Sequence, residues 1–364
     1  MGTNAAPPGD EFSDHNYGKP TDGFTRLTTS LETVSGDLGT TETPVDRFFV
    51  CSASEPPTLS TDTWRLTIDG DAVQRPVTMD FAQLDELPRQ TITAWLECAG
   101  NGRSMFTLVD GREIPAENAH TGWMLGGMGL ARWEGPRLRD VLAEAGVTDR
   151  AAFVSPVGLD VDNTEGEPAR MCLPLDKARD DATIVATHMN GQPLVPAHGA
   201  PVRLVVPGWV GAYSVKWLGG LTVSSSWVPS WRSDVYYVHR TPEDEITGPV
   251  TAHPVKSSLA IPYPAAIGPG WQELVGYARS GSGPITAVDW SIDGGPWRSA
   301  ELDEPAGPYA WTVFRFEVDL EPGEHIIRSR ATDNSGATQP EQQPFHPYGV
   351  LWQSVIPHPV TVRA

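Results

Sequence analysis

The residues with the clearest capacity for chemistry are a cysteine at a turn and a later group of polar and basic side chains. Cys98 stands in TITAWLECAGNGRSMF, where an apolar run gives way to Ala-Gly-Asn-Gly. A cysteine thiolate is a soft ligand for a polarisable metal, and Arg with Lys suits an anionic phosphate. Together these residue types indicate an anionic metal cofactor. The later group, which flanks a Pro-Gly-rich loop, consists of His198, Arg203, Ser214 and Lys216.

Each of these residues also has a purely structural interpretation. Free cysteines are among the most buried residues in proteins, so Cys98 fits an inert core thiol. His198, which precedes a glycine, fits a turn residue bonded to backbone. Arg203 and Lys216 fit the solvated ends of apolar strands, and Trp123 fits ordinary core packing. Spacing alone therefore leaves the functional site open.

The element that positions Cys98 is predicted to be a strand. Ile92, Ala94, Leu96 and Cys98 alternate with Thr, Trp and Glu, which is the period of a half-buried strand. We therefore expect Cys98 at the end of the apolar face, where the strand meets a glycine-rich turn.

Helices are predicted to be few and short in the first half of the chain. Residues 80–87 read as a helix in which Asp80 is the N-cap and Gln83 completes a capping box. Residues 135–146 carry apolar side chains at helical spacing up to a glycine. In 202–223, two apolar runs flank the Pro-Gly-rich loop, an arrangement that lets backbone approach a ligand closely.

Length and composition predict two domains with different architectures. A chain of 364 residues exceeds the usual size of one domain, and its 36 Gly and 34 Pro favour short strands joined by tight turns. We expect an extended N-terminal arm over 1–45, an α+β domain over 46–244 and an all-β domain over 245–364. In the last, 286–297 and 313–320 alternate strictly, which is typical of an immunoglobulin-like sandwich.

Charge and the absence of common motifs exclude several function classes. The formal charge is −20 and only 4 of 26 basic residues are Lys, so we do not expect the chain to bind nucleic acid. No run approaches 18 apolar residues and no leader is visible, so we expect no membrane span and a cytoplasmic protein, or a periplasmic one if a leader has been removed. Phosphate-loop, dinucleotide and zinc-protease motifs are missing, and no Cys-x-x-Cys-His is present to attach haem.

Four stretches in this order resemble the sulfite oxidase family of molybdenum enzymes. The resemblance runs from about Arg47 to the C-terminus, and the last part is similar to the immunoglobulin-like dimerisation domain of that family. The stretches are ECAGNGR (97–103), ARWEGPRLRDVL (131–142), MNGQPLVPAHGAPVRLVVPGWVG (189–211) and SVKWLGGL (214–221).

The resemblance implies one molybdenum held by a pyranopterin dithiolene and by the thiolate of Cys98. It also implies oxygen-atom transfer, with Arg103, Trp123 and Tyr236 in the substrate pocket and Tyr237 as the alternative tyrosine. A homodimer and a separate electron acceptor are implied as well, and the acidic surface would favour a basic one such as a c-type cytochrome. The cofactor-binding residues implied are Phe49, Cys51, Cys98, Asp160, His198, Arg203, Ser214 and Lys216.

This sequence departs from the family at the substrate pocket. Cys51 follows the Phe-Phe-Val run where the family usually carries an arginine, and Tyr213 also stands in place of one. The C-terminal stretch 348–360 contains no arginine either. Replacing a cation by a thiol removes a contact worth about 1.5 to 3 kcal/mol, or roughly ten- to a hundred-fold in anion binding. Cys51 is then either a second thiol near the metal or a structural residue.

Three functional hypotheses follow. The first is a molybdenum oxidoreductase acting on a small oxyanion or sulfur compound, with sulfite the first candidate. The second is a reductase of a sulfoxide, an N-oxide or nitrate on the same centre. The third is a metal-free binding or structural protein that keeps the fold.

Overall fold

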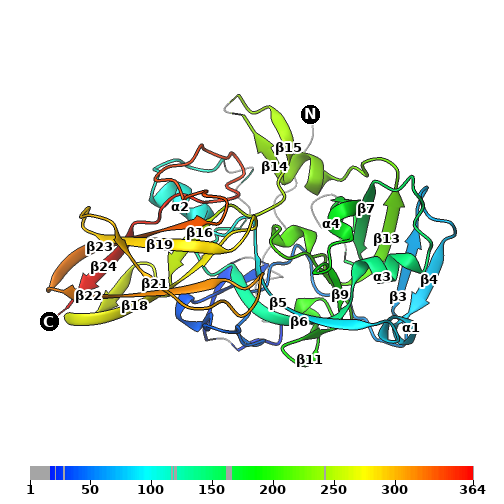
Figure 1. The fold of residues 1–364 in the computed structure, drawn as a ribbon, viewed down its shortest axis with the longest axis horizontal. Coiled ribbons are helices and arrows are strands. Elements are labelled where there is room, and N and C mark those ends of the chain that lie inside the picture. The colour runs from blue at the N-terminus through cyan, green and yellow to red at the C-terminus, as the bar shows by residue number, and fades with distance from the viewer. Residues whose placement is uncertain are drawn as a thin grey trace.

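The structure is a computed structural model of the chain and describes residues 17–20, 22–27, 29–115, 118, 121–160, 166–241 and 243–363. Two lobes lie side by side in Figure 1, one built around the central strand β13 (Leu218–Ser224) and one built from the last third of the chain. A ribbon formed by β5 (Arg89–Glu97) and β6 (Met128–Pro136) runs between them. Cys98 directly follows β5, so the two lobes meet close to it.

The first lobe contains a five-stranded sheet in the order β4-β3-β13-β7-β8. Strand β13 pairs parallel with β3 and antiparallel with β7. The core of the first lobe is apolar and buried, and the side chains that alternate toward one face of these strands contribute to it. The other strands are β3 (Arg65–Asp69), β4 (Val77–Asp80), β7 (Phe153–Gly158) and β8 (Leu173–Pro174).

Both predicted helices are confirmed, although each is shorter than its predicted range. In α1 (Phe81–Asp85) the Asp80 side chain accepts from Gln83 N while Gln83 bonds back to Asp80 N, which is the expected capping box. Helix α3 (Leu138–Ala143) buries its apolar face. The other helical segments are α2 (Arg103–Leu108), α4 (Leu175–Ala178), the 3-10 turns η2 (Ser35–Asp37), η3 (Pro196–His198) and η4 (Gly211–Tyr213), and the π-helical η5 (Arg232–Tyr236).

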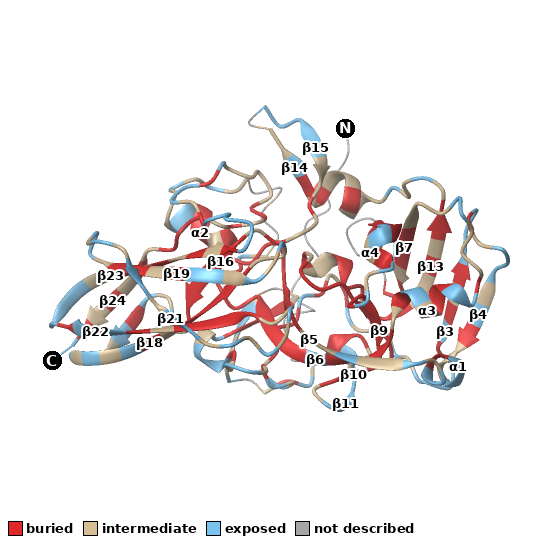
Figure 2. Cartoon of the chain, in the orientation of Figure 1, coloured by how far each residue is buried: buried red, intermediate tan, exposed pale blue. Residues whose placement is uncertain are grey.

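Strand β5 corrects the prediction of a half-buried strand. From Ala94 onward every residue is buried, including Trp95 and Glu97 on the face predicted to be polar. Trp95 packs into a cluster with Tyr277 and Trp311 of the second lobe. Figure 2 shows the buried residues at the end of β5 and over most of β6. The strand is covered on both faces because the second lobe packs against the face that alternation assigns to solvent.

Strands β5 and β6 belong to a sheet in the order β11-β10-β6-β5, and within the described residues three two-stranded sheets, β1-β2, β12-β9 and β14-β15, accompany it. The described part of the predicted N-terminal arm is more structured than its composition indicates, because β2 is wholly buried and Leu31 bridges Val50. Residues 1–16 of that arm lie outside the described residues. The remaining strands are β1 (Phe24–Leu27), β2 (Ser30–Thr33), β9 (Ile184–Ala186), β10 (His188–Met189), β11 (Gln192–Pro193), β12 (Arg203–Val205), β14 (Val238–Arg240) and β15 (Ile246–Pro249).

The second lobe is a β-sandwich, which confirms the predicted fold class. One sheet has the order β16-β18-β22-β21 and the other β17-β24-β23-β19-β20. Their inner faces enclose one apolar core, in which Trp290 stacks on Phe316 with ring centroids 4.3 Å apart. The strands are β16 (Lys256–Leu259), β17 (Ala265–Ile267), β18 (Gly270–Arg279), β19 (Ile285–Ile292), β20 (Arg298–Ser299), β21 (Glu301–Leu302), β22 (Thr312–Leu320), β23 (Gly323–Asp333) and β24 (His358–Val362).

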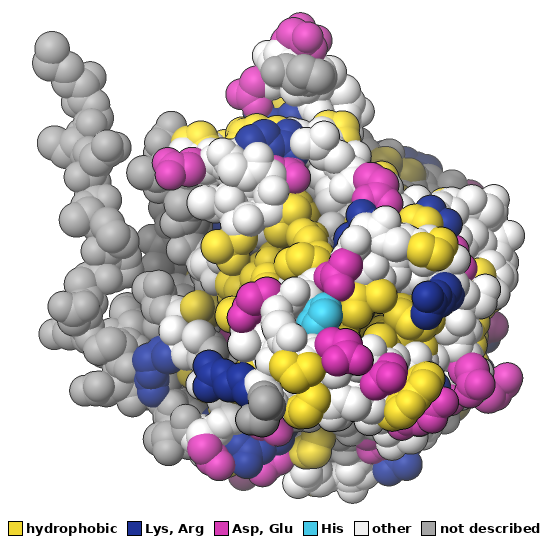
Figure 3. Space-filling view, turned by 90° about the vertical axis from the view of Figure 1, so that its left-hand side faces the viewer, with side chains coloured by type: hydrophobic (Ala, Val, Ile, Leu, Met, Phe, Trp, Pro, Cys, Tyr) yellow, Lys and Arg dark blue, Asp and Glu magenta, His cyan; other side chains and the backbone are white. Residues whose placement is uncertain are grey.

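The outer surface of the sandwich end is partly apolar. Figure 3 shows hydrophobic side chains gathered in the middle of this face, with carboxylates around them.

Among the described residues, no helix is both long and apolar enough to cross a membrane.

Candidate active site

The glycine-rich turn after β5 lets an arginine and a tryptophan pack against the backbone next to Cys98. Cys98 N donates to Gly127 O at 2.9 Å, and Asn101 N closes the turn onto Cys98 O at 2.9 Å. A Cβ on Gly100 would lie 2.6 Å from the Arg103 guanidinium and 3.2 Å from the Trp123 ring. Glycine is therefore required at Gly100 because these two side chains occupy the space that a Cβ would need.

Two thiols face each other at this turn. Cys51 Sγ lies 3.9 Å from Cys98 Sγ, so the structure brings the second predicted cysteine to the candidate metal ligand. Cys98 is 8% exposed, whereas Cys51 is exposed. The hydrogen bond from Cys98, followed by the positive charge of Lys216, lowers the pKa of Cys51 to about 6. Cys172 is buried elsewhere and takes no part.

On one side of the thiols, Arg103 and Tyr236 form a hydrogen-bonded pair. Arg103 Nη2 donates to the Tyr236 hydroxyl at 3.0 Å, and its other nitrogens donate to Thr121 O at 2.7 Å and to Tyr348 O at 3.1 Å. Tyr236 is 7% exposed, and burial raises the pKa of its hydroxyl. The hydrogen bond distinguishes Tyr236 from the neighbouring Tyr237 as the partner of Arg103. The arginine is held rigidly, which is the property that an oxyanion site needs.

A row of buried aromatic rings packs beside the thiols and leads from Trp123 to His198. Trp123 is 1% exposed and meets Phe49 edge to face, with ring centroids 6.0 Å apart. Phe49 stacks on Phe48, whose ring in turn packs against His198. These contacts place the predicted Phe49 and Trp123 in the same buried cluster as Cys98.

On the other side, His198, Arg203, Ser214 and Lys216 come together. Arg203 Nη1 donates to His198 O at 3.1 Å and its Nη2 to Ser214 O at 2.9 Å. Lys216 Nζ donates to Ser52 Oγ and to Ala197 O, both at 3.3 Å. Since Ser52 is the neighbour of Cys51, Lys216 connects this group of cations to the thiols.

This cation cluster has the electrostatics of an anion site. Arg203 is 5% exposed, and burial lowers its pKa to about 9. Burial likewise lowers the pKa of Lys216 to about 7. Within the described ranges, neither side chain has a carboxylate at ion-pair distance, although buried charges are normally paired. A bound phosphate would supply the missing negative charge.

Asp160 supplies an acceptor at the same place. It is 8% exposed, and among the residues that the structure describes its Oδ1 has no hydrogen-bond partner. Burial raises the pKa of the carboxyl, while Arg232 and Lys216 favour its charged form. A Cβ on Gly158 would lie 2.2 Å from Oδ1, so glycine makes room for this orientation. The unpartnered oxygen fits an N–H donor of a pterin, and the residues present therefore fit a phosphorylated pterin with a metal at Cys98.

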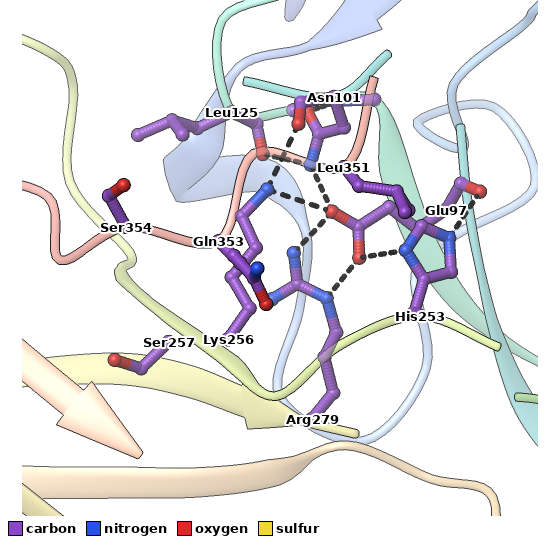
Figure 4. A network of polar contacts seen from close by, with 12 residues as sticks. Glu97, Asn101, Leu125, His253, Lys256, Ser257, Arg279, Leu351, Gln353 and Ser354 are labelled. Atoms are coloured by element: carbon purple, nitrogen blue, oxygen red, sulfur yellow. Dashed lines mark hydrogen bonds and ion pairs between the residues drawn. The ribbon is translucent and has the colours of Figure 1, made fainter. Parts of the chain in front are cut away.

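The structure also brings in residues that sequence reasoning missed. Glu97, next to Cys98, is 1% exposed and accepts from Arg279 Nη2 at 2.7 Å, from Lys256 Nζ at 3.1 Å and from Asn101 Nδ2 at 2.8 Å (Figure 4). His253 Nε2 lies 3.0 Å from the Glu97 carbonyl. Burial alone would raise the pKa of the Glu97 carboxyl, but Arg279 and Lys256 hold it well below its usual range.

This network ties the end of β5 to the sandwich lobe, since Lys256 begins β16 and Arg279 ends β18. No signal in the local sequence could have found it, because Glu97 lies more than 150 residues from Lys256 and from Arg279. Arg232, on η5, is a second missed residue, and its charge acts on both Cys51 and Asp160.

Comparisons with known proteins match most of the chain to family models. The Oxidoreductase molybdopterin binding domain family matches residues 53–231, and the Mo-co oxidoreductase dimerisation domain family matches residues 254–355. Mitochondrial sulfite oxidase of Mus musculus is 35% identical over 82% of this chain and 57% of its own length. Sulfite oxidase of Gallus gallus is 36% identical over 82% of this chain and 68% of its own. The chain thus spans little more than half of the mouse protein.

A solved structure matches nearly the whole chain. The sulfane dehydrogenase SoxCD from Paracoccus pantotrophus superimposes with a TM-score of 0.80 and 28% identity, covering 98% of this chain and 91% of that one. Both lobes are therefore shared with that structure.

Proposed function

This chain belongs to the sulfite oxidase family of molybdenum-cofactor oxidoreductases, and from that premise we propose that it oxidises a small sulfur compound by oxygen-atom transfer. The observation that carries the proposal is the position of Cys98. Its thiol lies between cations suited to a phosphate and the rigid pair of Arg103 and Tyr236. When bound, the cofactor supplies two-electron redox chemistry and oxygen-atom transfer.

The chain's own residues divide the work of holding the cofactor. Cys98 would provide the thiolate ligand to molybdenum. Arg203 and Lys216, with His198 and Ser214, would neutralise the phosphate, and Asp160 would accept a hydrogen bond from the pterin. Charge-assisted bonds of this kind are the strong ones, and each is worth about 1.5 to 3 kcal/mol.

The substrate side binds and orients an oxyanion. Three carbonyl or hydroxyl oxygens fix the Arg103 guanidinium, so it does not have to reorganise when charge develops on the substrate. The Tyr236 hydroxyl accepts from Arg103 Nη2, which fixes the position of the phenol beside the guanidinium. Trp123 and Phe49 exclude water behind them.

We propose sulfite as the first candidate substrate and a sulfane sulfur group as the second. Oxidation of sulfite takes one oxygen from water and yields sulfate, two protons and two electrons. Cys51 stands where the family resemblance implies an arginine that would bind such a dianion. The absence of that cation weakens the case for sulfite. The resemblance to a sulfane dehydrogenase and the exposed thiol of Cys51 favour a substrate that presents a less charged sulfur.

The first test is molybdenum per chain, measured by plasma mass spectrometry on protein from a host that supplies the cofactor. We expect about one molybdenum per chain in the wild type and none in Cys98→Ser. Steady-state oxidation of sulfite, thiosulfate and a small persulfide then ranks the substrates. A wild-type chain without molybdenum would defeat the proposal. Turnover of only nitrate, an N-oxide or a sulfoxide with a reduced dye would show that the enzyme is a reductase instead of an oxidase.

Cys51→Arg tests the choice between the two substrates. Restoring the cation is expected to raise kcat/KM for sulfite about ten- to a hundred-fold, while Cys51→Ser leaves it nearly unchanged. If the arginine gives no gain with sulfite, the thiol does not decide substrate choice.

We further propose that the chain forms a homodimer through the sandwich lobe. We also propose that its electrons pass to a separate protein whose positive charge complements the negative charge of this chain. The match to a dimerisation domain over residues 254–355 supports the dimer, and the formal charge of −20 supports the acceptor. Electrostatic docking predicts that the rate with a basic c-type cytochrome falls as salt increases, and a salt-independent rate would exclude it.

A further inference from the structure

The structure describes all three cysteines of the sequence, and two of them form a pair of thiols in contact. Cys51 Sγ and Cys98 Sγ lie 3.9 Å apart. The third, Cys172, is buried elsewhere, and its Sγ accepts from Val228 N at 3.5 Å. A disulfide within one chain would therefore join Cys51 to Cys98.

Backbone hydrogen bonds hold both cysteines at this separation. Cys98 N donates to Gly127 O at 2.9 Å. Next to Cys51, Val50 exchanges two backbone hydrogen bonds with Leu31, at 2.8 and 2.9 Å. The thiols meet because two anchored segments, 47 residues apart in the sequence, lie side by side. The contact thus belongs to the fold and does not depend on a loose loop.

The geometry allows the two sulfurs to bond with little movement. A disulfide bond is about 2.0 Å long, so the sulfurs have to approach each other by about 2 Å. Rotation of a cysteine side chain about its Cα–Cβ bond moves the sulfur over this distance while the backbone stays in place. Cys51 is exposed and Cys98 is only 8% exposed, so a dissolved oxidant reaches Cys51 first.

A small disulfide such as oxidised glutathione supplies the oxidant in two exchange steps. The Cys51 sulfur attacks one glutathione sulfur, which forms a mixed disulfide and releases one reduced glutathione. The Cys98 sulfur then attacks Cys51 Sγ, which forms the protein disulfide and releases the second. The two cysteines lose two electrons and two protons, and the two glutathione thiols gain them.

We propose that Cys51 and Cys98 are an oxidative modification site, which forms a reversible disulfide in the cofactor-free chain and thereby prevents the molybdenum cofactor from binding. The disulfide itself needs only the two thiols. Its effect on cofactor binding rests on the proposed function, because a sulfur bonded to Cys51 no longer provides a thiolate ligand. Once the cofactor is bound, Cys98 is engaged as a ligand and the disulfide does not form.

The first experiment treats the full-length, cofactor-free chain with oxidised glutathione. The number of free thiols should fall from three to one in chains that stay monomeric on a denaturing, non-reducing gel. Trypsin should then release a peptide in which residues 48–65 are joined to residues 90–103, and dithiothreitol should separate them. A chain that carries glutathione on Cys51 without this joined peptide would overturn the proposal.

Two variants show which thiols are responsible. Cys51→Ser should keep both of its remaining thiols free of a disulfide under the same treatment. Cys172→Ala is the matched control, because it removes the cysteine outside the pair and should form the joined peptide as the wild type does. Equal formation of an internal disulfide in Cys51→Ser and in the wild type would contradict the assignment.

The second experiment measures cofactor binding by the oxidised and the reduced chain. Both are mixed with cofactor released from another molybdenum enzyme, and molybdenum per chain is measured by plasma mass spectrometry. The oxidised chain should take up no molybdenum until dithiothreitol is added, whereas the reduced chain should take it up at once and then resist formation of the joined peptide. Equal uptake by the two forms would overturn the blocking role. If the reduced chain also takes up none, the proposed function fails, while the joined peptide still decides whether the disulfide forms.

Discussion

Two buried groups of cations are connected to the region of Cys98, one through its neighbour Glu97 and one through Ser52 beside Cys51, and they differ in one respect. In the Glu97 network, Lys256 and Arg279 surround a carboxylate that belongs to the chain. In the cation cluster, Arg203 and Lys216 bond only to carbonyls, a hydroxyl and aromatic rings within the described residues. Within the described residues, the first group has a carboxylate of the chain at ion-pair distance, and the second does not.

The difference separates structure from binding. A buried charge with its partner in the chain holds elements together, and here it joins β5 to the sandwich lobe. A buried charge without such a partner raises the free energy of the protein alone and lowers that of the complex with an anion. The two groups should therefore respond in opposite ways when a charge is removed.

The largest effect is expected from Glu97→Gln. The substitution leaves Lys256 and Arg279 buried without a counter-charge, which should lower the free energy of unfolding by about 3 to 5 kcal/mol. Denaturant unfolding of the cofactor-free chain measures it. Asp289→Asn is the control, because it removes the partner of Arg330 in a half-exposed ion pair of 3.1 Å and should cost less than about 1 kcal/mol. Similar losses in the two variants would remove the contrast on which the comparison depends.

Arg203→Met is expected to change the free energy of unfolding less than Glu97→Gln does, and to impair cofactor binding instead. The cofactor-free chain loses three bonds to carbonyls but also a desolvated charge, so its free energy of unfolding should change by less than about 2 kcal/mol. Molybdenum occupancy should fall about ten- to a hundred-fold under limiting cofactor. Metal analysis and denaturant unfolding of the same preparations test both statements. Destabilisation of several kcal/mol with full occupancy would make Arg203 a structural residue like Arg279.

The smallest effect is a pH dependence carried by Lys19. Its pKa is about 7 in the folded chain and 10.5 for the free side chain, so the unfolded state binds more protons between these values. Stability should therefore rise with pH from about 7, by up to about 1.4 kcal/mol per pH unit, and the contribution should be flat below pH 7. Subtracting the curve of Lys19→Met from that of the wild type isolates this contribution.

Local signals in the sequence were sufficient for several elements. The capping box at Asp80 and Gln83 and the alternating strands of the second lobe required only neighbouring residues, and the structure has both. Strand β5 was predicted with the wrong exposure, since alternation reports chemistry along one strand and not what packs on each face. Glu97 was assigned to solvent for that reason.

By itself, the sequence determined which residues could bind a metal, a phosphate or a sulfur oxyanion, because thiol, guanidinium and ammonium chemistry belongs to the side chain. It also determined where strands and glycine turns form, because those depend on local backbone preferences. Only the tertiary structure decided which charges share a buried space. Glu97 meets Arg279 from 182 positions away and Lys19 meets His198 from 179, and contacts at that separation arise from tertiary packing rather than from any local pattern.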